Sequence, residues 1–471
     1  MPRCRLAIVV LIALGSGGCR SALVEPDIAR LYDRSAQEHD DARNPVIVIP
    51  GILGSRLVAG DRVVWGAFGG GAVDPQEPDD ARLMALPLIR DEGERLQDLG
   101  DEVVSRGALD RIDVHLFGLQ IQQRAYLYIL ATLGAGMYRD ELLGKAGAID
   151  YGNDHYTCFQ FDYDWRRDLA HNARRLDRFI ARAREQVRKH RPSGEIRFDI
   201  VAHSMGGLLS RYYLRYGTQD LPDDGALPAL TWDGAENVDR LILVGTPNAG
   251  SAEAILQLVN GYAPALFLPF YDPVILGTFP SIFQLLPRDR HGPLVVDGQR
   301  VDRLYDPEFW IEQDWGLANP EYDDTLAVLL PDVEDATERR RIALLHLRKS
   351  LERAAHFHRA LDAPANAPTG LEIHLFAGDA IDTVAVVAPD GDGGAEVVDR
   401  APGDGTVLRT SALLDERVGA ADWTRQLRTP IDFTAVHLLF TDHLQLTADP
   451  GFSDNVLYLL LEDPRRRPVE P

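Results

Sequence analysis

The spacing of apolar residues predicts short buried strands that alternate with amphipathic helices. The run Val46–Ile49 is apolar on both faces, as is typical of a central parallel strand. Similar runs predict strands at residues 157–162, 196–201, 240–244, 371–376 and 433–440. Helical spacing predicts helices at residues 122–133, 170–190, 334–361 and 452–461, and one that starts near Leu208. The alternation of strand and helix implies parallel strands with helices on both faces, which is an α/β fold.

Two long stretches interrupt this alternation. Residues 58–118 show no clear period, so we expect a small insert outside the core. Residues 251–370 are predicted to form a larger cap, and prolines within its apolar stretch Ala263–Phe283 forbid a continuous spanning helix. The predicted core therefore has two parts, residues 45–250 and 371–471. A hairpin is expected at Ala385–Val398, turning at residues 389–394.

The N-terminus has the pattern of an export signal. Arg3 and Arg5 precede the apolar run Leu6–Leu14, which is too short to span a membrane, and small residues lead to Cys19. We therefore predict a signal peptide at residues 1–18, with Cys19 as a candidate lipidated first residue of a bacterial envelope lipoprotein. An ordinary signal peptide of a secreted or periplasmic protein is the alternative. A polar tether with one short helix is expected at residues 19–44, and folded structure is expected from Pro45.

Charge and cysteine content exclude several classes of function. The 471 residues include 72 acidic and 49 basic ones, a net charge of -23, which argues against nucleic-acid binding and against electrostatic attraction to anionic lipids. Any contact with a membrane surface must then be mainly hydrophobic. Removal of Cys4 and modification of Cys19 would leave only Cys158, so no disulfide is expected. No metal-binding spacing is present, and we expect neither a metal nor a cofactor.

A candidate nucleophile lies where the predicted strand at residues 196–201 meets the next helix. Small residues flank Ser204 at the two positions where a sharp turn brings backbones together, with Ala202 before it and Gly206 after it. Such a turn lifts the hydroxyl above the sheet edge, as in the G-x-S-x-G elbow, from which this sequence departs by a methyl group at Ala202. The alternative is a buried serine that caps a helix.

A serine nucleophile needs a base and a carboxylate that orients it. Asp404 lies in the tight loop Gly403–Val407, and His443 follows the last predicted strand, so Ser204, Asp404 and His443 occur in the order that α/β-hydrolases use. Asp379 and Asp382 are rival acids because they also follow a late strand. The remaining candidate bases, His437 within a strand and His203 beside the serine, are interpreted as structural.

Two backbone N–H groups are candidate oxyanion donors. The glycine-rich loop Pro50–Ser55 follows the first buried strand, where α/β-hydrolases place one donor, and the second comes from the residue after the nucleophile. We assign these donors to Ile52 and Met205. The alternative for Pro50–Ser55 is an ordinary turn.

Six motifs together resemble one known family. They are PVIVIPGILGS at residues 45–55, FDYDWR at 161–166, AHSMGG at 202–207, GTPNAGS at 245–251, GDGTV at 403–407 and VHLLFTDHLQL at 436–446. In this order they resemble the lecithin:cholesterol acyltransferase family, which includes lysosomal phospholipase A2 and phospholipid:diacylglycerol acyltransferase.

The resemblance implies an α/β-hydrolase core with a membrane-binding insert and a cap or lid. It implies a triad of Ser204, Asp404 and His443, with oxyanion amides at Ile52 and Met205. It also implies transfer of an acyl group from a lipid or phospholipid to an alcohol or to water. Disulfides of the animal enzymes cannot form in this chain.

The expected function is therefore that of a lipid O-acyltransferase or phospholipase A-type acyl hydrolase with an acyl-enzyme intermediate. A triacylglycerol lipase or carboxylesterase without transferase preference is one alternative. A surface-anchored binding protein that keeps the fold without turnover is another.

Overall fold

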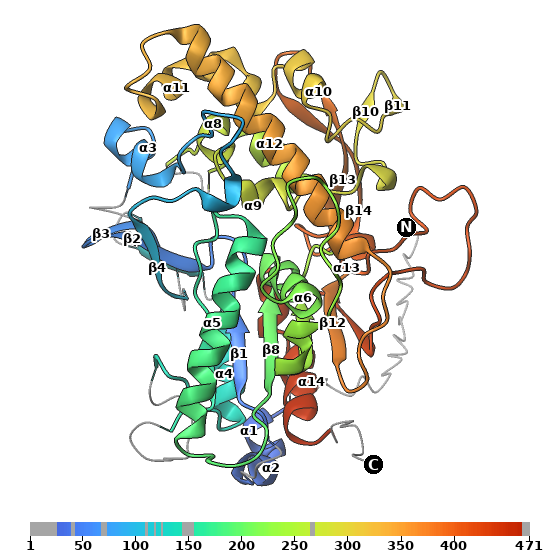
Figure 1. Ribbon diagram of the computed structural model, residues 1–471. Coiled ribbons are helices and arrows are strands. Elements are labelled where there is room, and N and C mark those ends of the chain that lie inside the picture. Colours follow the sequence, from blue (N-terminus) through green and yellow to red (C-terminus); the bar gives the residue numbers. More distant parts are fainter. Residues whose placement is uncertain are drawn as a thin grey trace, which may run out of the picture.

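The central element of the fold is a six-stranded sheet, seen in a computed structural model of the chain (Figure 1). The structure describes residues 26–38, 43–66, 73–108, 112–116, 119–123, 126–143, 155–263 and 269–463. The predictions for the signal peptide and for Cys19 therefore lie outside the described residues, as do residues 264–268 of the predicted cap.

All neighbouring strands of this sheet are parallel. The strands are β1 (Val46–Ile49), β7 (Cys158–Gln160), β8 (Phe198–His203), β9 (Val238–Val244), β12 (Glu372–Gly378) and β15 (Ala435–Leu439). Their order is β15-β12-β9-β8-β1-β7. β1, β8 and β9 are buried along their whole length, which explains their apolar runs. The predicted parallel α/β fold is confirmed, and the loops after the strands gather at one edge of the sheet.

Helices cover both faces of the sheet (Figure 1). α5 (Leu169–Arg188) and α6 (Met205–Tyr216) pack on one face, where they share the main hydrophobic core. α4 (Leu127–Ala135) and α14 (Pro450–Leu461) contribute to the second core, on the other face. Such burial of two sheet faces by amphipathic helices supplies most of the hydrophobic stabilisation of an α/β fold.

A smaller antiparallel sheet follows β1. It has the order β3 (Arg62–Trp65), β2 (Ser55–Ala59), β4 (Val103–Ala108), and α3 (Pro78–Met84) lies between β3 and β4 in the chain. An insert is predicted here from the sequence, but its strands are not. They are short, and buried and exposed positions alternate only weakly along β2 and β4.

The helix predicted at residues 122–133 is wrong at its start. A hairpin of β5 (Ile112–Leu116) and β6 (Leu119–Gln123) precedes it, and α4 begins only at Leu127. Apolar residues at 119 and 121 alternate with glutamines, which is the period of a strand rather than of a helix. The rest of the predicted helix lies within α4.

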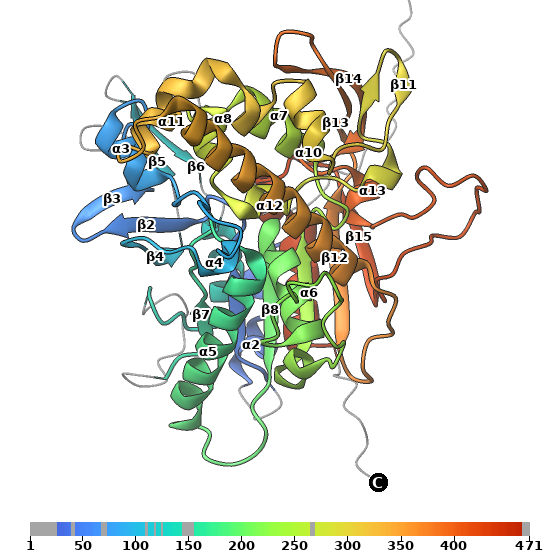
Figure 2. The same cartoon turned by 45° about the horizontal axis from the view of Figure 1, so that its top comes forward.

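Residues 251–370, called the cap segment below, form mostly short helices near the end of the sheet where β1 and β8 end (Figures 1 and 2). Its elements are α7 (Ala252–Asn260), α8 (Pro273–Leu276), α9 (Pro280–Phe283), β10 (Val295–Val296), β11 (Gln299–Arg300), α10 (Pro307–Glu312), α11 (Asp323–Leu329) and α12 (Ala336–Asp362). Prolines at the first turns of α8, α9 and α10 explain why the apolar stretch gives short helices. α12 matches the long helix predicted at residues 334–361.

A buried ion pair anchors the cap segment to the core. Asp168 caps the N-terminus of α5, and its carboxylate accepts hydrogen bonds from Arg353 of α12 at 3.0 and 3.1 Å. Gln284 donates to the same carboxylate at 2.7 Å. Because the Asp168 side chain is fully buried, each of these donors is needed to offset its desolvation.

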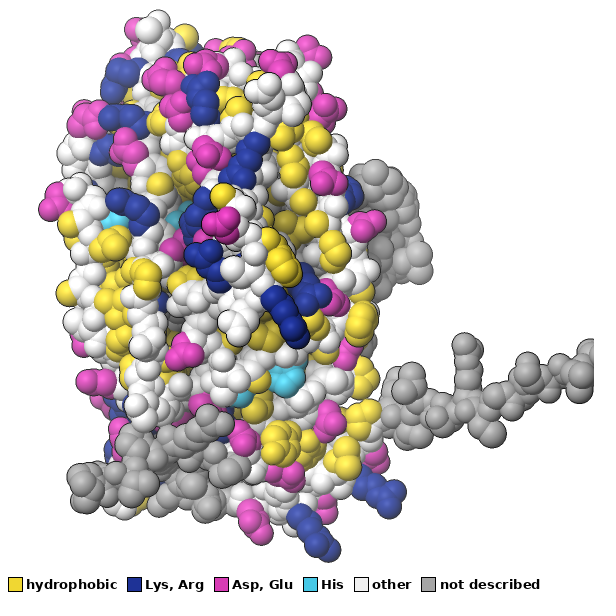
Figure 3. All heavy atoms as spheres, turned by 90° about the vertical axis from the view of Figure 1, so that its right-hand side faces the viewer, with side chains coloured by type: hydrophobic (Ala, Val, Ile, Leu, Met, Phe, Trp, Pro, Cys, Tyr) yellow, Lys and Arg dark blue, Asp and Glu magenta, His cyan; other side chains and the backbone are white. Residues whose placement is uncertain are grey.

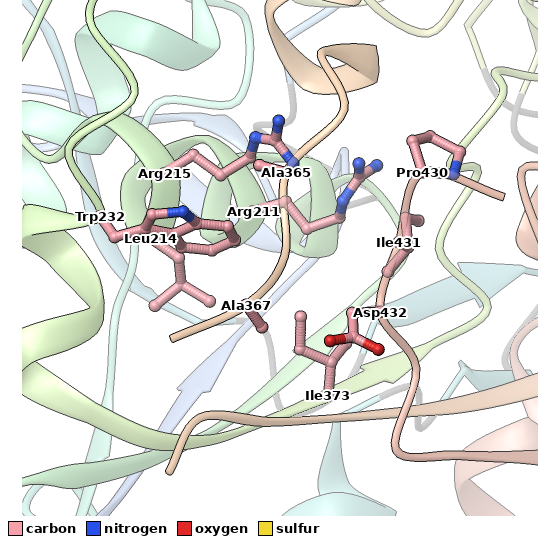
Figure 4. A pocket seen from close by; sticks show the side chains of 10 residues that line it. All are labelled: Arg211, Leu214, Arg215, Trp232, Ala365, Ala367, Ile373, Pro430, Ile431 and Asp432. Atoms are coloured by element: carbon pink, nitrogen blue, oxygen red, sulfur yellow. The ribbon is translucent and has the colours of Figure 1, made fainter. Parts of the chain in front are cut away.

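The C-terminus of α12 is held by the helix that follows Ser204. Arg211 donates to the carbonyl of Leu361 at 2.9 Å, and Arg215 donates to that of Ala363. Both arginines line a small pocket together with Trp232 (Figure 4). Since cations satisfy the free carbonyls at a helix C-terminus, these two side chains have a structural task.

The remaining elements complete the chain. β13 (Ile381–Pro389) and β14 (Ala395–Gly403) form the predicted hairpin, and α13 (Arg409–Ala412) follows it. Short 3-10 turns lie at Leu96–Asp98, Asp233–Asn237, Asp289–His291, Gly316–Ala318, Pro320–Tyr322 and Gln445–Ala448. Within the described ranges, the helices are all too short or too polar to cross a bilayer.

Ordered structure begins before Pro45. Two short helices, α1 (Ile28–Leu31) and α2 (Asp33–Gln37), occupy part of the predicted tether. Tyr32 is buried between them, and its hydroxyl donates to the Asp454 carboxylate on α14 at 2.7 Å. Because this segment is mostly polar, its sequence does not predict the few contacts that attach it to the core.

Candidate active site

The predicted nucleophile lies on a strained turn between β8 and α6. Ser204 has φ 54° and ψ -127°, a conformation that is costly for a residue with a side chain. Its N–H donates to the carbonyl of Val244 on the neighbouring strand at 2.8 Å, which helps to hold this turn. A Cβ at Gly206 would lie 2.5 Å from the carbonyl oxygen of Pro50, so only glycine fits there. The buried Ala202, in contrast, accommodates its methyl group.

Three distant side chains meet at this turn. Nε2 of His443 lies 3.0 Å from Oγ of Ser204, and Nδ1 of His443 lies 2.8 Å from Oδ2 of Asp404. His443 follows β15 of the six-stranded sheet, whereas Asp404 follows β14 of the separate β13–β14 hairpin. Ser204, Asp404 and His443 are only 7%, 1% and 9% exposed, so the hydroxyl and the imidazole face an almost closed space.

The Asp404 carboxylate is positioned by its own loop. Its Oδ1 accepts hydrogen bonds from the backbone N–H groups of Thr406 at 3.0 Å and Val407 at 2.7 Å. Burial alone would raise the pKa of Asp404, but the adjacent His443 and these N–H donors outweigh it and hold the pKa below its usual value. Asp404 therefore stays ionised at neutral pH and can stabilise a protonated imidazole.

The rival residues lie apart from this contact. Asp379 pairs with Arg409 at 3.2 Å, and Asp382 is exposed. His437 stacks on Phe376, with ring centroids 4.5 Å apart. None of these side chains takes part in the contact of Ser204, His443 and Asp404.

The loop after β1 lies directly against the serine. A Cβ at Gly51 would lie 2.7 Å from Cβ of Ser204 and 3.2 Å from its Oγ, so the glycine allows this close approach. Among the described residues, the N–H groups of Ile52 and Met205 have no hydrogen-bond acceptor. The oxyanion role of these two groups stays a prediction.

Sequence reasoning did not single out Tyr126. Its buried hydroxyl accepts a hydrogen bond from the N–H of Gly51 at 2.8 Å and lies 3.3 Å from Nδ1 of His203. The only sequence signal would have been an aromatic residue near the start of α4, which is far more often a core residue than a site residue.

The surroundings of the site offer few metal ligands. In the part of the chain that the structure describes, no group of three His, Cys, Asp or Glu side chains could hold a metal ion.

On the face shown in Figure 3, acidic and basic side chains are interspersed, so the negative charge is not gathered there into one patch. A hydrophobic substrate would meet no single field of charge on this side.

One of the solved structures found to be similar supports the fold. A chain of the crystal structure titled "The crystal structure of Tle4-Tli4 complex" is similar with a TM-score of 0.56 and 14% identity, over 90% of this chain and 99% of that chain. The lipase BlEst2 of Bacillus licheniformis in its mature form gives a TM-score of 0.35 and 13% identity, over 90% of this chain and 94% of that chain. No curated protein sequence matches the chain.

One family matches at the level of sequence. The model described as lecithin:cholesterol acyltransferase matches residues 134–325, which include Ser204, α6 and part of the cap segment. At a general level this supports an enzyme that acts on acyl esters of lipids. The chain is thus similar to this family over less than half of its length, and the parallel sheet described above agrees with an α/β fold.

Proposed function

We propose that the chain is a serine-dependent lipid acyl hydrolase and O-acyltransferase that forms an acyl-enzyme on Ser204. The observation that carries this proposal is the continuous hydrogen-bonded series from Ser204 through His443 to Asp404. A serine hydroxyl is a weak nucleophile, and an imidazole 3.0 Å from Oγ is close enough to take its proton during attack.

The proposed reaction has two halves. In the first, Oγ of Ser204 attacks the ester carbonyl while Nε2 of His443 takes the proton, and the same nitrogen then protonates the departing alcohol. In the second, water or another alcohol gives its proton to His443 and attacks the acyl-enzyme, and the proton returns to Ser204. The N–H groups of Ile52 and Met205 would stabilise the oxyanion in both halves.

A lipid is the expected acyl donor. The family match supports lipid esters in general, and a phospholipid is the donor that the family resemblance implies. The net charge of -23 favours hydrophobic rather than electrostatic contact with a membrane surface. Whether water or an alcohol is the preferred acceptor depends on how well the acyl-enzyme is shielded from water.

The experiment is incubation of the purified protein with vesicles of a phospholipid that carries labelled acyl chains, with and without a sterol or a diacylglycerol. We expect labelled fatty acid, together with a labelled new ester when an acceptor alcohol is present. Ser204→Ala should abolish both products, whereas Ser350→Ala, which alters a buried serine on α12, should keep them. Release of fatty acid without any new ester would indicate a phospholipase A-type acyl hydrolase without transferase activity, and activity on triacylglycerol or simple esters alone would favour a lipase or carboxylesterase. Absence of both products with every ester tested would favour a binding protein.

Export is a separate part of the proposal. The pattern of Arg3, Arg5, Leu6–Leu14 and Cys19 supports cleavage before Cys19 and its lipidation. Intact mass of the protein from the cell envelope tests this. A diacylated N-terminal Cys19 is the expected species, and an unmodified N-terminus near the same position would indicate an ordinary secreted protein.

A further inference from the structure

A series of hydrogen bonds runs from the loop after β1 to the backbone of His443. The N–H of Gly51 donates to the hydroxyl of Tyr126 at 2.8 Å, and that hydroxyl lies 3.3 Å from Nδ1 of His203. Nε2 of His203 lies 3.1 Å from the carbonyl oxygen of His443. The series therefore connects the loop of one predicted oxyanion donor with the residue of the predicted base.

The direction of every bond in this series is fixed. Burial, with a smaller effect of His443, lowers the pKa of His203 to about 3, so its ring is neutral and carries one N–H. Because a carbonyl can only accept, Nε2 of His203 must carry the hydrogen. Nδ1 is then the acceptor for the Tyr126 hydroxyl, which leaves the oxygen of Tyr126 to accept from Gly51.

The loop at one end of the series is held at several other points. Tyr163 donates to the carbonyl of Pro50 at 2.9 Å, and Gly54 N–H donates to that of Gly51 at 3.2 Å. Trp65 donates to the carbonyl of Leu53 at 2.8 Å. Since the carbonyl of Gly51 and the N–H of Ile52 belong to one planar peptide unit, holding the first also orients the second.

The backbone of His443 at the other end is held on both sides. Its N–H donates to the carbonyl of Asp404 at 2.9 Å, and its carbonyl accepts from His203. The rings of His203 and His443 lie 4.8 Å apart. A shift of the His443 main chain away from Ser204 would break the bond to His203.

We infer that Tyr126 and His203 are positioning residues, which hold the Pro50–Gly51 peptide, next to the N–H of Ile52, and the main chain of His443 at a fixed separation across Ser204. This inference rests on the proposed function. Neither side chain would touch the substrate. Their contribution is to keep one oxyanion donor and the general base aligned in the transition state, where small displacements are costly.

Three variants break the series at different bonds. Tyr126→Phe keeps the ring and removes the hydroxyl. His203→Asn can place an amide oxygen where Nδ1 was but cannot reach His443, whereas His203→Gln can place an amide N–H where Nε2 was but loses the acceptor for Tyr126. Each should lower kcat on a soluble short-chain p-nitrophenyl ester by about ten- to a hundredfold. KM should change by less than about threefold, because ground-state binding is not affected.

The cap segment contains a matched control. Tyr305 and His358 form a similar pair, with the Tyr305 hydroxyl 2.9 Å from Nδ1 of His358 and Nε2 of His358 2.9 Å from the carbonyl of Gln284. The Tyr305 hydroxyl also lies within hydrogen-bond distance of the carbonyls of Leu286 and Pro287. The control pair touches neither Ser204 nor His443. Tyr305→Phe and His358→Gln should lower the melting temperature about as much as the Tyr126 and His203 variants do. Their kcat should stay within about twofold of the parent.

A double variant separates positioning from general loss of stability. Tyr126 and His203 act through one series of hydrogen bonds. The double variant Tyr126→Phe with His203→Gln should therefore have a kcat no lower than that of the less active of the two single variants. Equal kcat in the parent, Tyr126→Phe and both His203 variants would overturn the inference, as would additive losses. If a His203 variant fails to fold, the isosteric Tyr126→Phe decides alone. An inactive parent would instead contradict the proposed function.

Discussion

Asp404 and His443 are joined by two hydrogen bonds, one between side chains and one between main chains. Oδ2 of Asp404 lies 2.8 Å from Nδ1 of His443, and the carbonyl of Asp404 accepts from the N–H of His443 at 2.9 Å. The main-chain bond sets the distance between the two loops, and the side-chain bond selects the tautomer in which Nε2 faces Ser204. The main-chain bond does not depend on side-chain chemistry, so it keeps the two loops together when either side chain is replaced.

Asp404→Asn should therefore separate catalysis from folding. We expect kcat on a p-nitrophenyl ester to fall by about 10³- to 10⁴-fold, because an amide favours the wrong imidazole tautomer and cannot stabilise its charge. The main-chain bond stays in place, so circular dichroism should show a folded protein. Asp379→Asn is the matched control, since that carboxylate pairs with Arg409, and it should keep kcat within about threefold. A large loss in Asp379→Asn with an active Asp404→Asn would assign the acid to Asp379.

Gly51→Ala should reduce turnover by steric displacement. The added Cβ would lie 2.7 Å from Cβ of Ser204, so either the nucleophile or the loop of Ile52 must move. A displacement of about 1 Å at a catalytic group can cost about a hundredfold in rate. Gly93→Ala is the control because its added Cβ would meet no atom within 4 Å. Steady-state kinetics on the same ester test this, and unchanged kcat in Gly51→Ala would show that the loop can relax freely.

Asp168→Asn should weaken the attachment of the cap segment to the core. Loss of the carboxylate leaves the buried Arg353 with Asp220 as its remaining acidic partner, at 2.6 Å. We expect a fall of about 3 kcal/mol in the free energy of unfolding, at the lower end of values for a broken buried ion pair. Urea denaturation at pH 7 measures it. Glu312→Gln, which removes the exposed partner of Arg303, should leave the midpoint unchanged, and equal midpoints for both variants would refute the anchor.

Acidification should destabilise the chain through its buried neutral histidines. Burial lowers the pKa of His346 to about 3, and its Nδ1 accepts from the N–H of Ile89 at 3.0 Å. An unfolded histidine has a pKa of about 6.5, so between pH 6.5 and 3 the unfolded chain binds a proton that the folded chain does not. Stability from this group is complete above that window and is lost as pH falls through it, by about 1.4 kcal/mol per pH unit.

His346→Asn keeps an acceptor for Ile89 and removes the titration. The free energy of unfolding of this variant should fall less steeply than that of the parent between pH 6 and pH 4, when both are measured by denaturant titration. Parallel curves for the two proteins would mean that His346 is already charged in the folded state.

Much of the core could be predicted from the sequence because its strands are buried on both faces. β1, β8 and β9 have continuous apolar runs, and the turn at Ser204 has small residues on both sides. Asp404 and His443 could be proposed because each follows a late strand in the order that α/β-hydrolases use, although β14 belongs to the separate β13–β14 hairpin. The contacts among the three side chains depend on how these loops pack rather than on sequence spacing.

Other parts could not be predicted for physical reasons. β2 and β4 are short and lie outside the six-stranded sheet, and their alternation of buried and exposed positions is weak. The β5–β6 hairpin does alternate, but each of its strands has only five residues. Tyr126 lies 77 residues before His203 in the chain, and its contact with Gly51 depends on how α4 packs behind β1. A hydrogen bond between distant buried side chains leaves no local pattern.

The most direct test of the central claim is covalent labelling of the purified protein with a fluorophosphonate, followed by peptide mass mapping and an ester assay. The account predicts one phosphonyl group per chain, attached to Ser204, with loss of activity in proportion to labelling. Ser204→Ala should take up no label, and His443→Ala should take it up far more slowly than the parent. A parent that stays unlabelled and active, or equal labelling of Ser204→Ala, would contradict the account.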